Sequence, residues 1–388
     1  MFSDSYKPRI SGVVNAVEGF SEELRRRGHR VYIVAPAAPG YADSDRDVVR
    51  VPSVTLRRYP DFPLAPPWMP RAGRRLAALG LDVVHTHTPF LMGRVAAGVA
   101  RRSSAPLVFT HHTLYTEYVH YVPLSAAVTR PAVRWYTTAF CNQCDCVIAP
   151  SRAVHDRLRA AGVRARIEVL TTGALTPEVF APRDASWVRA RFGIPAGAPL
   201  VVHVGRLGRE KSVDDLLRAF ARVAPEHDAH LLVVGGGPQE KALRDLAAQL
   251  GIAVRVTFAG PMPRVKALDC YAAGDLFATA SRTETAGLVI TEAMAVGLPV
   301  VAVASGGVPE AVADGETGLL AGDVEGLATV MRALLRDPGR RRRLAAQARE
   351  RARTFSIEGI TTSLLVIYES VQATRRPRTG MPARREYG

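Results

Sequence analysis

Lysine, cysteine and long apolar runs are scarce in this chain of 388 residues. Only four of its 51 basic residues are lysines, so an arginine-biased coding background explains much of the formal net charge of +15. The positive charge is spread along the chain instead of being gathered in an arm, and no nucleic-acid-binding module is recognisable, which argues against nucleic acid as a partner. With 47% apolar and 22% charged residues, the composition is that of a folded, soluble protein.

The four cysteines do not form a recognisable metal site. Cys141, Cys144 and Cys146 make a C-x-x-C-x-C run, and Cys270 stands far from it in the sequence. A four-ligand zinc site needs a second pair of cysteines or histidines at comparable spacing, and the sequence around Cys270 supplies neither. We therefore expect ordinary core thiols in a reducing compartment, and no metal.

A membrane-spanning segment and a secretory signal are also missing. The longest charge-free stretch, residues 293–309, contains three glycines and two prolines, which exclude a spanning helix. We therefore expect a cytoplasmic protein that at most binds peripherally to the inner face of the cell membrane.

Short apolar runs rich in β-branched residues alternate with helical segments in two series, a pattern typical of parallel sheets built from βαβ units. The first series comprises residues 30–35, 82–85, 106–110, 146–149 and 166–170, and the second comprises residues 199–204, 230–234, 254–259, 276–278 and 299–303. Because residues 171–184 contain one glycine and two prolines, they indicate a linker. The sequence thus predicts two α/β domains.

The domain boundaries follow from these series. We expect an N-terminal domain over residues 1–172, a C-terminal domain over residues 173–356, a last helix over residues 357–374, and a disordered tail over residues 375–388. Only Met1 and Phe2 precede a polar Ser-Asp-Ser segment, so the first strand is expected to be very short or to begin upstream.

The strongest local signal is the turn Gly205-Arg-Leu-Gly-Arg-Glu-Lys211, which follows a predicted buried strand and precedes an amphipathic helix. Ligands bind at the carboxyl ends of parallel strands, and two cations there can meet a diphosphate. Arg206 and Lys211 fit this role, although two solvated charges at a helix start remain the alternative. Lys211 is notable because the chain uses arginine for 47 of its 51 cations.

A second signal is a pair of carboxylates, Glu284 and Glu292, eight positions apart after the predicted strand 276–278. We expect Glu284 in the loop and Glu292 in the first turn of a helix over residues 291–296. Carboxylates accept hydrogen bonds from sugar hydroxyls, and the backbone of residues 285–287 could present N–H groups to phosphate. The alternative is a solvated loop charge and a partner of the helix dipole.

The N-terminal half offers weaker signals. Gly12 lies between the short first strand and a predicted helix over residues 13–27, where a structural glycine is the alternative. His111 and His112 follow the predicted strand 106–110, and histidines at that position face either a ligand crevice or the core. The spacing of these histidines, with His85 and His87, does not indicate a metal site, and the acidic segment 43–47 indicates a solvated loop.

With these motifs, nearly the whole chain resembles the retaining glycosyltransferases of family 4, which have the GT-B fold. The residues 109–121 resemble the diacylglycerol glucosyltransferases of that family. The motifs that carry the family resemblance are Ser3-Asp-Ser-Tyr-Lys-Pro-Arg-Ile-Ser-Gly12, Gly205-Arg-Leu-x-x-Glu-Lys211, Val234-Gly-Gly-Gly-Pro238, Glu284-x7-Glu292, Glu292-Ala-Met-Ala-x-Gly-Leu-Pro299 and Gly306-Gly-x-Pro-Glu310.

The resemblance implies an α/β, GT-B architecture: two Rossmann-like parallel-sheet domains facing each other across a central cleft. The first domain would bind the acceptor, the second would bind the nucleotide-sugar donor, and the last helix would pack back on the first domain. The resemblance also implies a hexosyltransferase that retains anomeric configuration, needs no metal or cofactor, and uses a UDP-sugar in preference to a GDP-sugar.

The resemblance further assigns roles to individual residues. Arg206 and Lys211 would bind the donor diphosphate, and Glu292 would hold the nucleotide ribose. The others would lie around the transferred sugar: Glu284 on its hydroxyls with Gly287 in the same loop, Gly12 near the diphosphate and His112 beside the reacting carbon. Three positions depart from the family pattern, namely Ser212, Ala286 and the segment Gly173-Ala-Leu175.

A membrane glycerolipid such as diacylglycerol is the acceptor that we expect, with glucose as the sugar. Residues 1–172 carry a net charge of +10 and the rest carries +5, so the acceptor half has the larger excess for an anionic membrane surface. The side chains that could insert beside these charges are Tyr59, Phe62, Leu64, Trp68 and Trp135. The alternatives are a family 4 transferase that uses GDP-mannose or another donor with a soluble acceptor, and a non-catalytic nucleotide-binding protein.

Overall fold

The computed structural model describes residues 1–374 except residues 10, 57–58, 65–69 and 122–123. The tail predicted over residues 375–388 therefore lies outside the described residues, as does Trp68. The side chains of Tyr59, Phe62 and Leu64 are also outside the part of the chain whose side chains are described.

The first half of the chain forms a parallel sheet that is joined at its centre by a single residue. Phe2 bridges both Val34 and Thr86, and its backbone N–H donates to the carbonyl of His85 over 2.8 Å. The very short first strand expected from the sequence is thus one residue of β-bridge. The strands of this half are β1 (Ile33–Pro36), β2 (Val48–Val51), β5 (Val84–Thr86), β6 (Leu107–Thr110), β7 (Cys146–Ala149) and β8 (Ile167–Val169), with an antiparallel hairpin of β3 (Val54–Leu56) and β4 (Tyr59–Leu64) beside them in the sequence.

The second half forms a six-stranded parallel sheet in the order β11-β10-β9-β12-β13-β14. Successive strands run outward in one direction from β9 and in the other direction from β12, so the chain reverses its winding between these two neighbours. Ligands of open α/β sheets bind at such a switch point, beyond the carboxyl ends of the strands. The strands are β9 (Leu200–Val204), β10 (His230–Val234), β11 (Val256–Gly260), β12 (Leu276–Thr279), β13 (Val300–Val303) and β14 (Gly318–Ala321).

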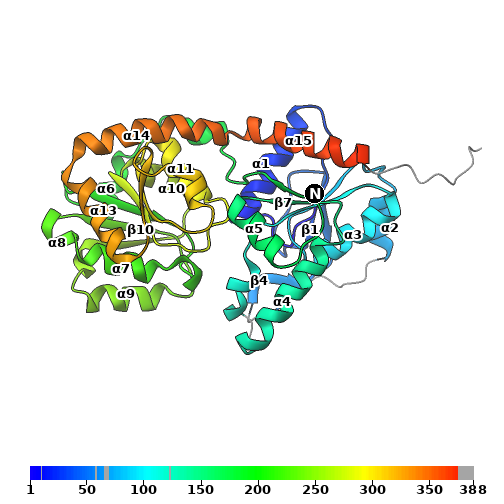
Figure 1. The fold of residues 1–388 in the computed structure, drawn as a ribbon, viewed down its shortest axis with the longest axis horizontal. Coiled ribbons are helices and arrows are strands. Elements are labelled where there is room, and N and C mark those ends of the chain that lie inside the picture. Colours follow the sequence, from blue (N-terminus) through cyan, green and yellow to red (C-terminus); the bar gives the residue numbers. More distant parts are fainter. Residues whose placement is uncertain (10, 57–58, 65–69, 122–123, 375–388) are drawn as a thin grey trace, which may run out of the picture.

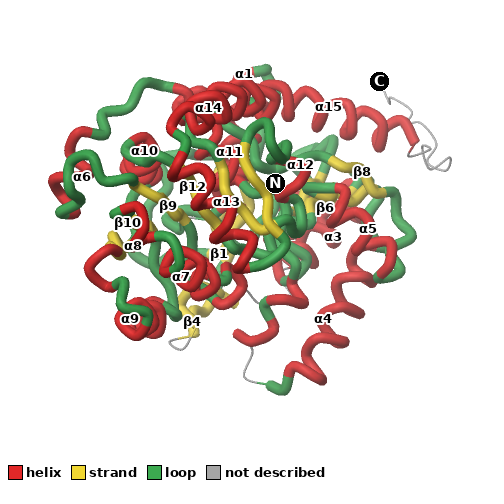
Figure 2. Tube along the Cα trace, turned by 60° about the vertical axis from the view of Figure 1, so that its left-hand side comes forward, coloured by secondary structure: helices red, strands yellow, loops and turns green. Residues whose placement is uncertain are grey.

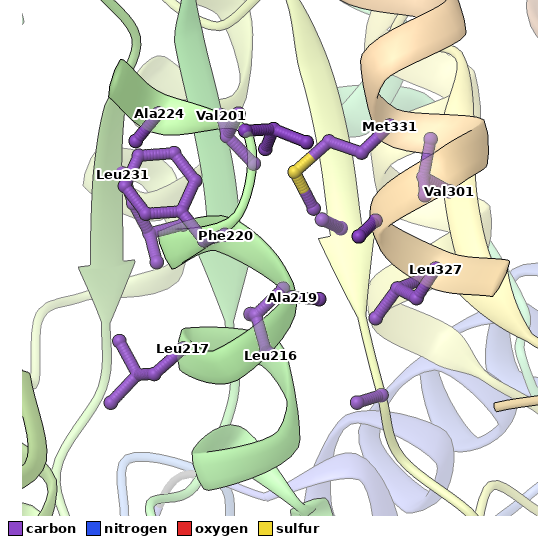
Figure 3. Close-up of a cluster of buried hydrophobic side chains, with 14 of the residues drawn as sticks. Val201, Leu216, Leu217, Ala219, Phe220, Ala224, Leu231, Val301, Leu327 and Met331 are labelled. Carbon is purple, nitrogen blue, oxygen red and sulfur yellow. The ribbon is translucent and has the colours of Figure 1, made fainter. Parts of the chain in front are cut away.

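Helices cover both faces of the second sheet. On one face, Leu216 and Phe220 of α7 pack near Leu327 and Met331 of α13 against the strands, and Figure 3 shows this buried cluster. On the other face, Tyr271 of α10 lies in a second cluster with residues of α11. The helices of this half are α6 (Ser186–Phe192), α7 (Val213–Ala221), α8 (Ala224–His227), α9 (Glu240–Gln249), α10 (Arg264–Ala272), α11 (Leu288–Val296), α12 (Val308–Ala311), α13 (Val324–Arg336) and α14 (Pro338–Ala352).

The last helix, α15 (Ile357–Thr374), returns from the second half to the first and packs on α1 (Figure 1). Its Leu364 is completely buried, and its Tyr368 hydroxyl lies 2.6 Å from His85 Nδ1. The other helices of the first half are α1 (Gly12–Arg26), α2 (Pro70–Ala77), α3 (Leu91–Ser103), α4 (Ala126–Cys141) and α5 (Arg152–Ala160).

Each strand run predicted from the sequence overlaps a strand of the structure, and the ends agree to within three residues. The strands β2, β3, β4 and β14 were not predicted, because β2, β3 and β14 have only three or four residues and β4 contains two prolines and an aspartate. The helix that carries Glu292 begins at Leu288 and not at Thr291, so Glu292 lies in its second turn. The reason is Gly287, which adopts the left-handed conformation (φ 67°) at the N-cap and lets the helix start earlier.

The four cysteines are free and buried. Burial raises the pKa of the thiols of Cys141 and Cys270 to about 12 and that of Cys146 to about 11, so they remain protonated and inert. Within the described part of the chain, no set of three or more His, Cys, Asp or Glu side chains is placed to hold a metal ion. None of the described helices has the length and apolar character to cross a membrane.

Candidate active site

Lys211 and Glu284 meet at the switch point of the second sheet. Lys211 ends a short 3-10 turn (Arg209–Lys211) after β9, and Glu284 lies in the loop after β12. The Lys211 Nζ lies 2.6 Å from Glu284 Oε1, although 73 residues separate them. One residue from each of the two strongest sequence motifs, Lys211 and Glu284, therefore forms an ion pair at the carboxyl edge of the sheet.

Both members of this pair are ionised. Burial lowers the pKa of Lys211, but Glu284 together with Tyr118 and Glu210 outweighs burial, so the pKa of the ammonium lies above its usual range. Burial likewise raises the pKa of Glu284, and the charge and hydrogen bond of Lys211 bring it below its usual range. The site therefore holds a fixed positive charge beside a carboxylate that accepts hydrogen bonds.

Glu292 lies on α11 and pairs with an arginine that the sequence did not single out. Arg264 Nε, at the start of α10, lies 2.8 Å from Glu292 Oε1, and the Tyr271 hydroxyl lies 3.5 Å from Oε2. Burial raises the pKa of Glu292, and Arg264 opposes that rise. The Arg264 Nη2 is buried with no partner among the described residues, so a ligand oxygen could accept from it.

Close backbone packing holds the loop that carries Glu284. A Cβ placed on Gly306 would lie 2.3 Å from the Glu284 carbonyl oxygen, and Gly306 has a φ of 58°. No side chain fits at this position, so glycine allows the two loops to touch. The neighbouring Gly307 N–H donates to the same Glu284 carbonyl over 2.8 Å, which fixes the loop further.

His112 lies at the interface between the two halves, directly after β6. Its Nε2 is 2.8 Å from His87 Nδ1, and its backbone carbonyl accepts a 2.8 Å hydrogen bond from the Thr285 hydroxyl. Thr285 follows Glu284 in the same loop, so His112 is brought to the loop of the carboxylate. Burial lowers the pKa of His112 to about 3, which keeps its imidazole neutral.

Arg206 is exposed on the same turn as Lys211 and contacts the first half. Its guanidinium carbon lies 5.1 Å from the centre of the Tyr121 ring, a cation–π contact. The Tyr121 hydroxyl donates to Glu210 Oε2 over 3.1 Å. These contacts lie beside a pocket of about 260 Å³ lined by His120, Tyr121, Arg209, Pro238 and Gln239, which belong to both halves.

Gly12 opens α1 and is exposed, with the N-cap hydroxyl of Ser11 accepting from the Val14 N–H. A Cβ at Gly12 would meet no atom within 4 Å. Packing among the described residues therefore does not require glycine here, and the space that a side chain at Gly12 would take is open. The start of α1 carries the positive end of the helix dipole, which attracts anions.

The structure thus joins Lys211 with Glu284 directly, and it joins His112 and Arg206 to the same two loops. It places Glu292 in a separate ion pair and Gly12 at an open helix start. Sequence reasoning missed Arg264, Tyr121 and the hydroxyl of Thr285, a residue whose backbone alone it had singled out. Arg264 could not be distinguished from the many other arginines of the sequence. Tyr121 could have been found, because it lies in the segment that resembles the diacylglycerol glucosyltransferases.

A further contact between the halves was also missed. Both carboxylate oxygens of Glu310 accept backbone N–H groups at the start of α5, from Arg152 over 2.8 Å and from Ala153 over 3.1 Å. Glu310 thus caps a helix of the other half, where a negative charge is stabilised by the helix dipole. In the sequence, Glu310 was noted only as the last residue of the Gly306-Gly-x-Pro-Glu310 motif.

Comparisons with known proteins agree with this geometry. The model of "Glycosyltransferase Family 4" matches residues 10–174, and the model of "Glycosyl transferases group 1" matches residues 187–351. The alpha-monoglucosyldiacylglycerol synthase of Streptococcus pneumoniae is 31% identical over 315 residues, covering 78% of this chain and 70% of that protein. A GDP-mannose-dependent alpha-mannosyltransferase of Mycobacterium tuberculosis is 32% identical over 382 residues, covering 96% of each.

Solved structures show the same architecture. The sucrose-phosphate synthase of Thermosynechococcus elongatus superposes with a TM-score of 0.76 at 25% identity, covering 96% of each chain. The expected fold class is confirmed, with two Rossmann-like domains in the GT-B arrangement. The chain belongs to glycosyltransferase family 4 and is similar to the diacylglycerol glucosyltransferases.

Proposed function

We propose that this glycosyltransferase moves glucose from UDP-glucose to the hydroxyl of a membrane glycerolipid such as diacylglycerol, with retention of configuration. The observation that carries the transfer chemistry is the buried Lys211–Glu284 pair at the switch point of the second sheet. The pair offers a cation for a diphosphate and a carboxylate for sugar hydroxyls, and a hydrogen bond joins these two groups.

We assign the donor to the domain of residues 173–356 and the acceptor to the domain of residues 1–172. Arg206 and Lys211 bind the diphosphate, Glu292 accepts from the ribose hydroxyls, and Glu284 accepts from hydroxyls of the transferred sugar. Gly287 gives the loop its left-handed turn. The open space at Gly12 suits the diphosphate, because the N–H groups at the start of α1 carry partial positive charge.

The roles that we propose for the cations follow from the charges that develop in the transition state of glycosyl transfer. When the glycosidic bond to the diphosphate breaks, positive charge grows on the anomeric carbon and negative charge grows on the departing diphosphate. Cations that are already in position stabilise that leaving group without reorganisation, so the chain's own side chains can supply this stabilisation without a metal.

Retention is explained by attack from the face that the diphosphate leaves. Glu284 and Glu292 are each paired with a cation, so we assign neither as a covalent nucleophile, and the departing phosphate oxygen takes the proton of the acceptor hydroxyl in this proposal. The neutral His112 then borders the reacting carbon without adding a second positive charge beside it.

The glycerolipid acceptor is supported by similarity and by charge. The pneumococcal relative is named a glucosyldiacylglycerol synthase, and residues 1–172 carry the larger positive excess, +10. Anionic lipids attract basic segments by about 1 kcal/mol per residue near the surface. We therefore place the enzyme in the cytoplasm, peripherally on the inner face of the cell membrane.

A second candidate is mannosyl transfer from GDP-mannose. It is favoured by the mycobacterial relative, which is matched over 96% of its length. Such an enzyme would accept a GDP-sugar and reject UDP-glucose.

A donor panel separates the candidates. UDP-glucose, other UDP-sugars and GDP-mannose are each incubated with the enzyme and a lipid extract or a mixture of soluble acceptors, and products are identified by mass spectrometry. We expect a hexosyl glycerolipid from UDP-glucose. A product formed only from GDP-mannose, or only with soluble acceptors, would favour the alternative, and nucleotide binding without any transfer would exclude both.

A further inference from the structure

His87 and His112 share one hydrogen bond inside the first domain. His87 directly follows β5 and His112 stands two residues after β6, and these paired strands end at the same edge of the sheet. The His87 Nδ1 lies 2.8 Å from the His112 Nε2, and the two rings are stacked with their centres 5.1 Å apart. Because two nitrogens at this distance share a single hydrogen, one ring donates and the other accepts.

Both imidazoles are neutral, because both are buried. Burial lowers the pKa of His112 to about 3, and burial together with the neighbouring His85 lowers the pKa of His87 well below its usual range. A neutral imidazole has one N–H donor and one nitrogen with a free lone pair. The pair can therefore adopt two arrangements, which differ in the ring that donates.

The other ring nitrogen of His87 separates the two arrangements. This Nε2 is buried and has no hydrogen-bond partner among the described residues. If His112 donated, His87 would carry its hydrogen on Nε2, which would leave a buried N–H without an acceptor. If His87 donates from Nδ1, its Nε2 carries only a lone pair. Unpartnered buried N–H groups are rarer in proteins than unpartnered acceptors, so donation by His87 is favoured.

Contacts with the rest of the first domain hold the ring of His87 in place. The ring of His85 lies against it, with centres 4.2 Å apart, and both nitrogens of His85 are occupied. Its Nδ1 is 2.6 Å from the Tyr368 hydroxyl on α15, which runs over the first domain (Figure 2), and its Nε2 is 2.7 Å from the Thr110 hydroxyl. The backbone N–H of His87 donates to the Phe2 carbonyl over 2.8 Å. The orientation of His87 is therefore set by the fold before a substrate binds.

We infer that His87 is a positioning residue, which donates from Nδ1 to His112 Nε2 and fixes His112 in the tautomer that carries its hydrogen on Nδ1. Because Nε2 is occupied, Nδ1 is the ring nitrogen of His112 that remains for a ligand. In this tautomer it is a neutral donor, which can give a hydrogen bond to a hydroxyl or phosphate oxygen without adding a positive charge.

A donor at His112 complements the carboxylate of Glu284. The Thr285 hydroxyl, next to Glu284 in the chain, donates to the backbone carbonyl of His112 over 2.8 Å, so the loop of Glu284 contacts His112 across the domain interface. A sugar hydroxyl both donates and accepts, whereas a carboxylate only accepts. The Nδ1–H of His112 supplies the missing donor. That the ligand is the transferred sugar rests on the proposed function, but the tautomer of His112 does not.

Long-range 15N–1H NMR of the full-length protein, with 15N in its ten histidine rings, tests the tautomer without any substrate. The signals of the two rings are assigned by their loss in His87→Asn and His112→Asn. We expect a protonated Nδ1 and an unprotonated Nε2 on both His87 and His112. A protonated Nε2 on His112 would overturn the inference, whatever the enzyme transfers.

Three substitutions of His87 test its effect on catalysis. Asparagine places its amide nitrogen near the position of Nδ1 and keeps a donor there, glutamine places it near Nε2, and leucine has no donor. With the nucleotide-sugar that the enzyme accepts, kcat should fall about tenfold in His87→Gln and His87→Leu and stay within about twofold in His87→Asn. The control is His29→Asn at an exposed position, which should leave kcat and the signals of His112 unchanged.

Circular dichroism verifies that the variants fold, and the comparison of His87→Asn with His87→Gln decides the outcome if leucine is not tolerated. Equal losses of kcat in these two variants would mean that His87 only supports the core and would overturn the positioning role. An unchanged kcat in folded His87→Gln would overturn it as well. If the predicted tautomer is found but no glucose is transferred, the proposed function is wrong and the tautomer of His112 stands.

Discussion

Lys211 is the side chain on which the proposed chemistry depends most. It is mostly buried, with 20% of its side chain exposed, and it is held against Glu284 by a 2.6 Å contact. Because both charges are fixed before the donor arrives, little reorganisation is needed when negative charge grows on the diphosphate. In the proposed function, the same pairing links the residue that binds the diphosphate to the residue that binds the sugar.

Replacing Lys211 with alanine should lower kcat by roughly 10²-fold or more, since one preorganised electrostatic contact is worth ~2.7–4 kcal/mol in the transition state. Steady-state kinetics with the native donor measures this loss. The control is Lys241→Ala, which removes an exposed lysine paired with Asp245 on α9 and should leave kcat unchanged. Near-normal turnover of Lys211→Ala would contradict the assignment.

Arg264 is expected to keep Glu292 ionised for the ribose. Removing the guanidinium leaves the effect of burial opposed only by the hydrogen bond from Tyr271, so the pKa of Glu292 rises further and its charged form is lost as the pH falls. Arg264→Gln should therefore raise the donor KM about tenfold, with a larger rise at acidic than at alkaline pH.

Donor KM measured across pH tests the role of Arg264, with Arg264→Lys as the conservative variant. Lysine keeps a positive charge and should restore part of the pH profile. A KM increase that is the same at every pH would mean that Arg264 supports the fold and does not tune Glu292.

These residues differ in how visible they are in sequence. Lys211 could be predicted because a rare lysine follows a strand and a glycine turn, which is local information. Arg264 could not, because it is one of 47 arginines and its contact with Glu292 spans 28 residues. The neutral state of His112 also depends on its burial in the folded protein, which no local pattern records.

Short connecting elements, more than the long helices, bring the two domains together. The loop of residues 284–285 reaches His112, the turn at Arg206 reaches Tyr121, and Glu310 reaches the start of α5. Each contact joins a loop, a turn or the short helix α12 of one domain to an element of the other. These polar contacts connect the two domains beside the candidate site.

Glu310→Ala should weaken this arrangement, because it removes a charged cap from the N-terminus of α5. Such caps are worth about 1 kcal/mol, so kcat/KM should fall roughly fivefold. Small-angle scattering should show a larger radius of gyration with the nucleotide bound. Glu316→Ala, at an exposed position near Glu310 in the sequence, serves as the control. An unchanged kcat/KM and an unchanged radius of gyration in Glu310→Ala would contradict a role of Glu310 in holding the two domains together.

Among the helices and strands, those marked by a periodic pattern or an apolar run were predicted from the sequence. The buried strands β6, β7 and β9 are continuous apolar runs and were recognised, whereas β14 is a four-residue strand that contains a glycine. The start of α11 was misplaced because Thr291 resembles a helix start, while the actual start depends on the left-handed Gly287. Ser212 also takes a left-handed φ of 49°, which explains why glycine is common there in the family.

At the scale of the whole molecule, the last helix α15 connects the two domains and packs against the first. The helix crosses from the second domain, packs on α1 and places Tyr368 against His85. His85 also lies 2.7 Å from the Thr110 hydroxyl on β6, so the last helix is connected to the strand that leads to His112. The last helix of the chain thereby packs against the first domain.

Leu364→Ala should destabilise the protein by about 2–5 kcal/mol, because it leaves a cavity where α15 meets the first domain. Denaturant unfolding, followed by probes in each domain, measures the loss. Val366 is 60% exposed on the same helix, so Val366→Ala should have little effect. Equal effects of the two substitutions would contradict the packing of α15.

Hexosyl transfer from a nucleotide-sugar to a glycerolipid, with retention, is the central claim about the whole molecule. Its most direct measurement follows UDP-glucose, whose sugar is α-linked, with diacylglycerol in vesicles, and determines the anomeric configuration of the purified product by proton NMR. We predict an α-glucosyl glycerolipid, formed by the unmodified protein and strongly reduced in Lys211→Ala. A β-linked product, or the absence of any glycolipid while another acceptor is glycosylated, would contradict that claim.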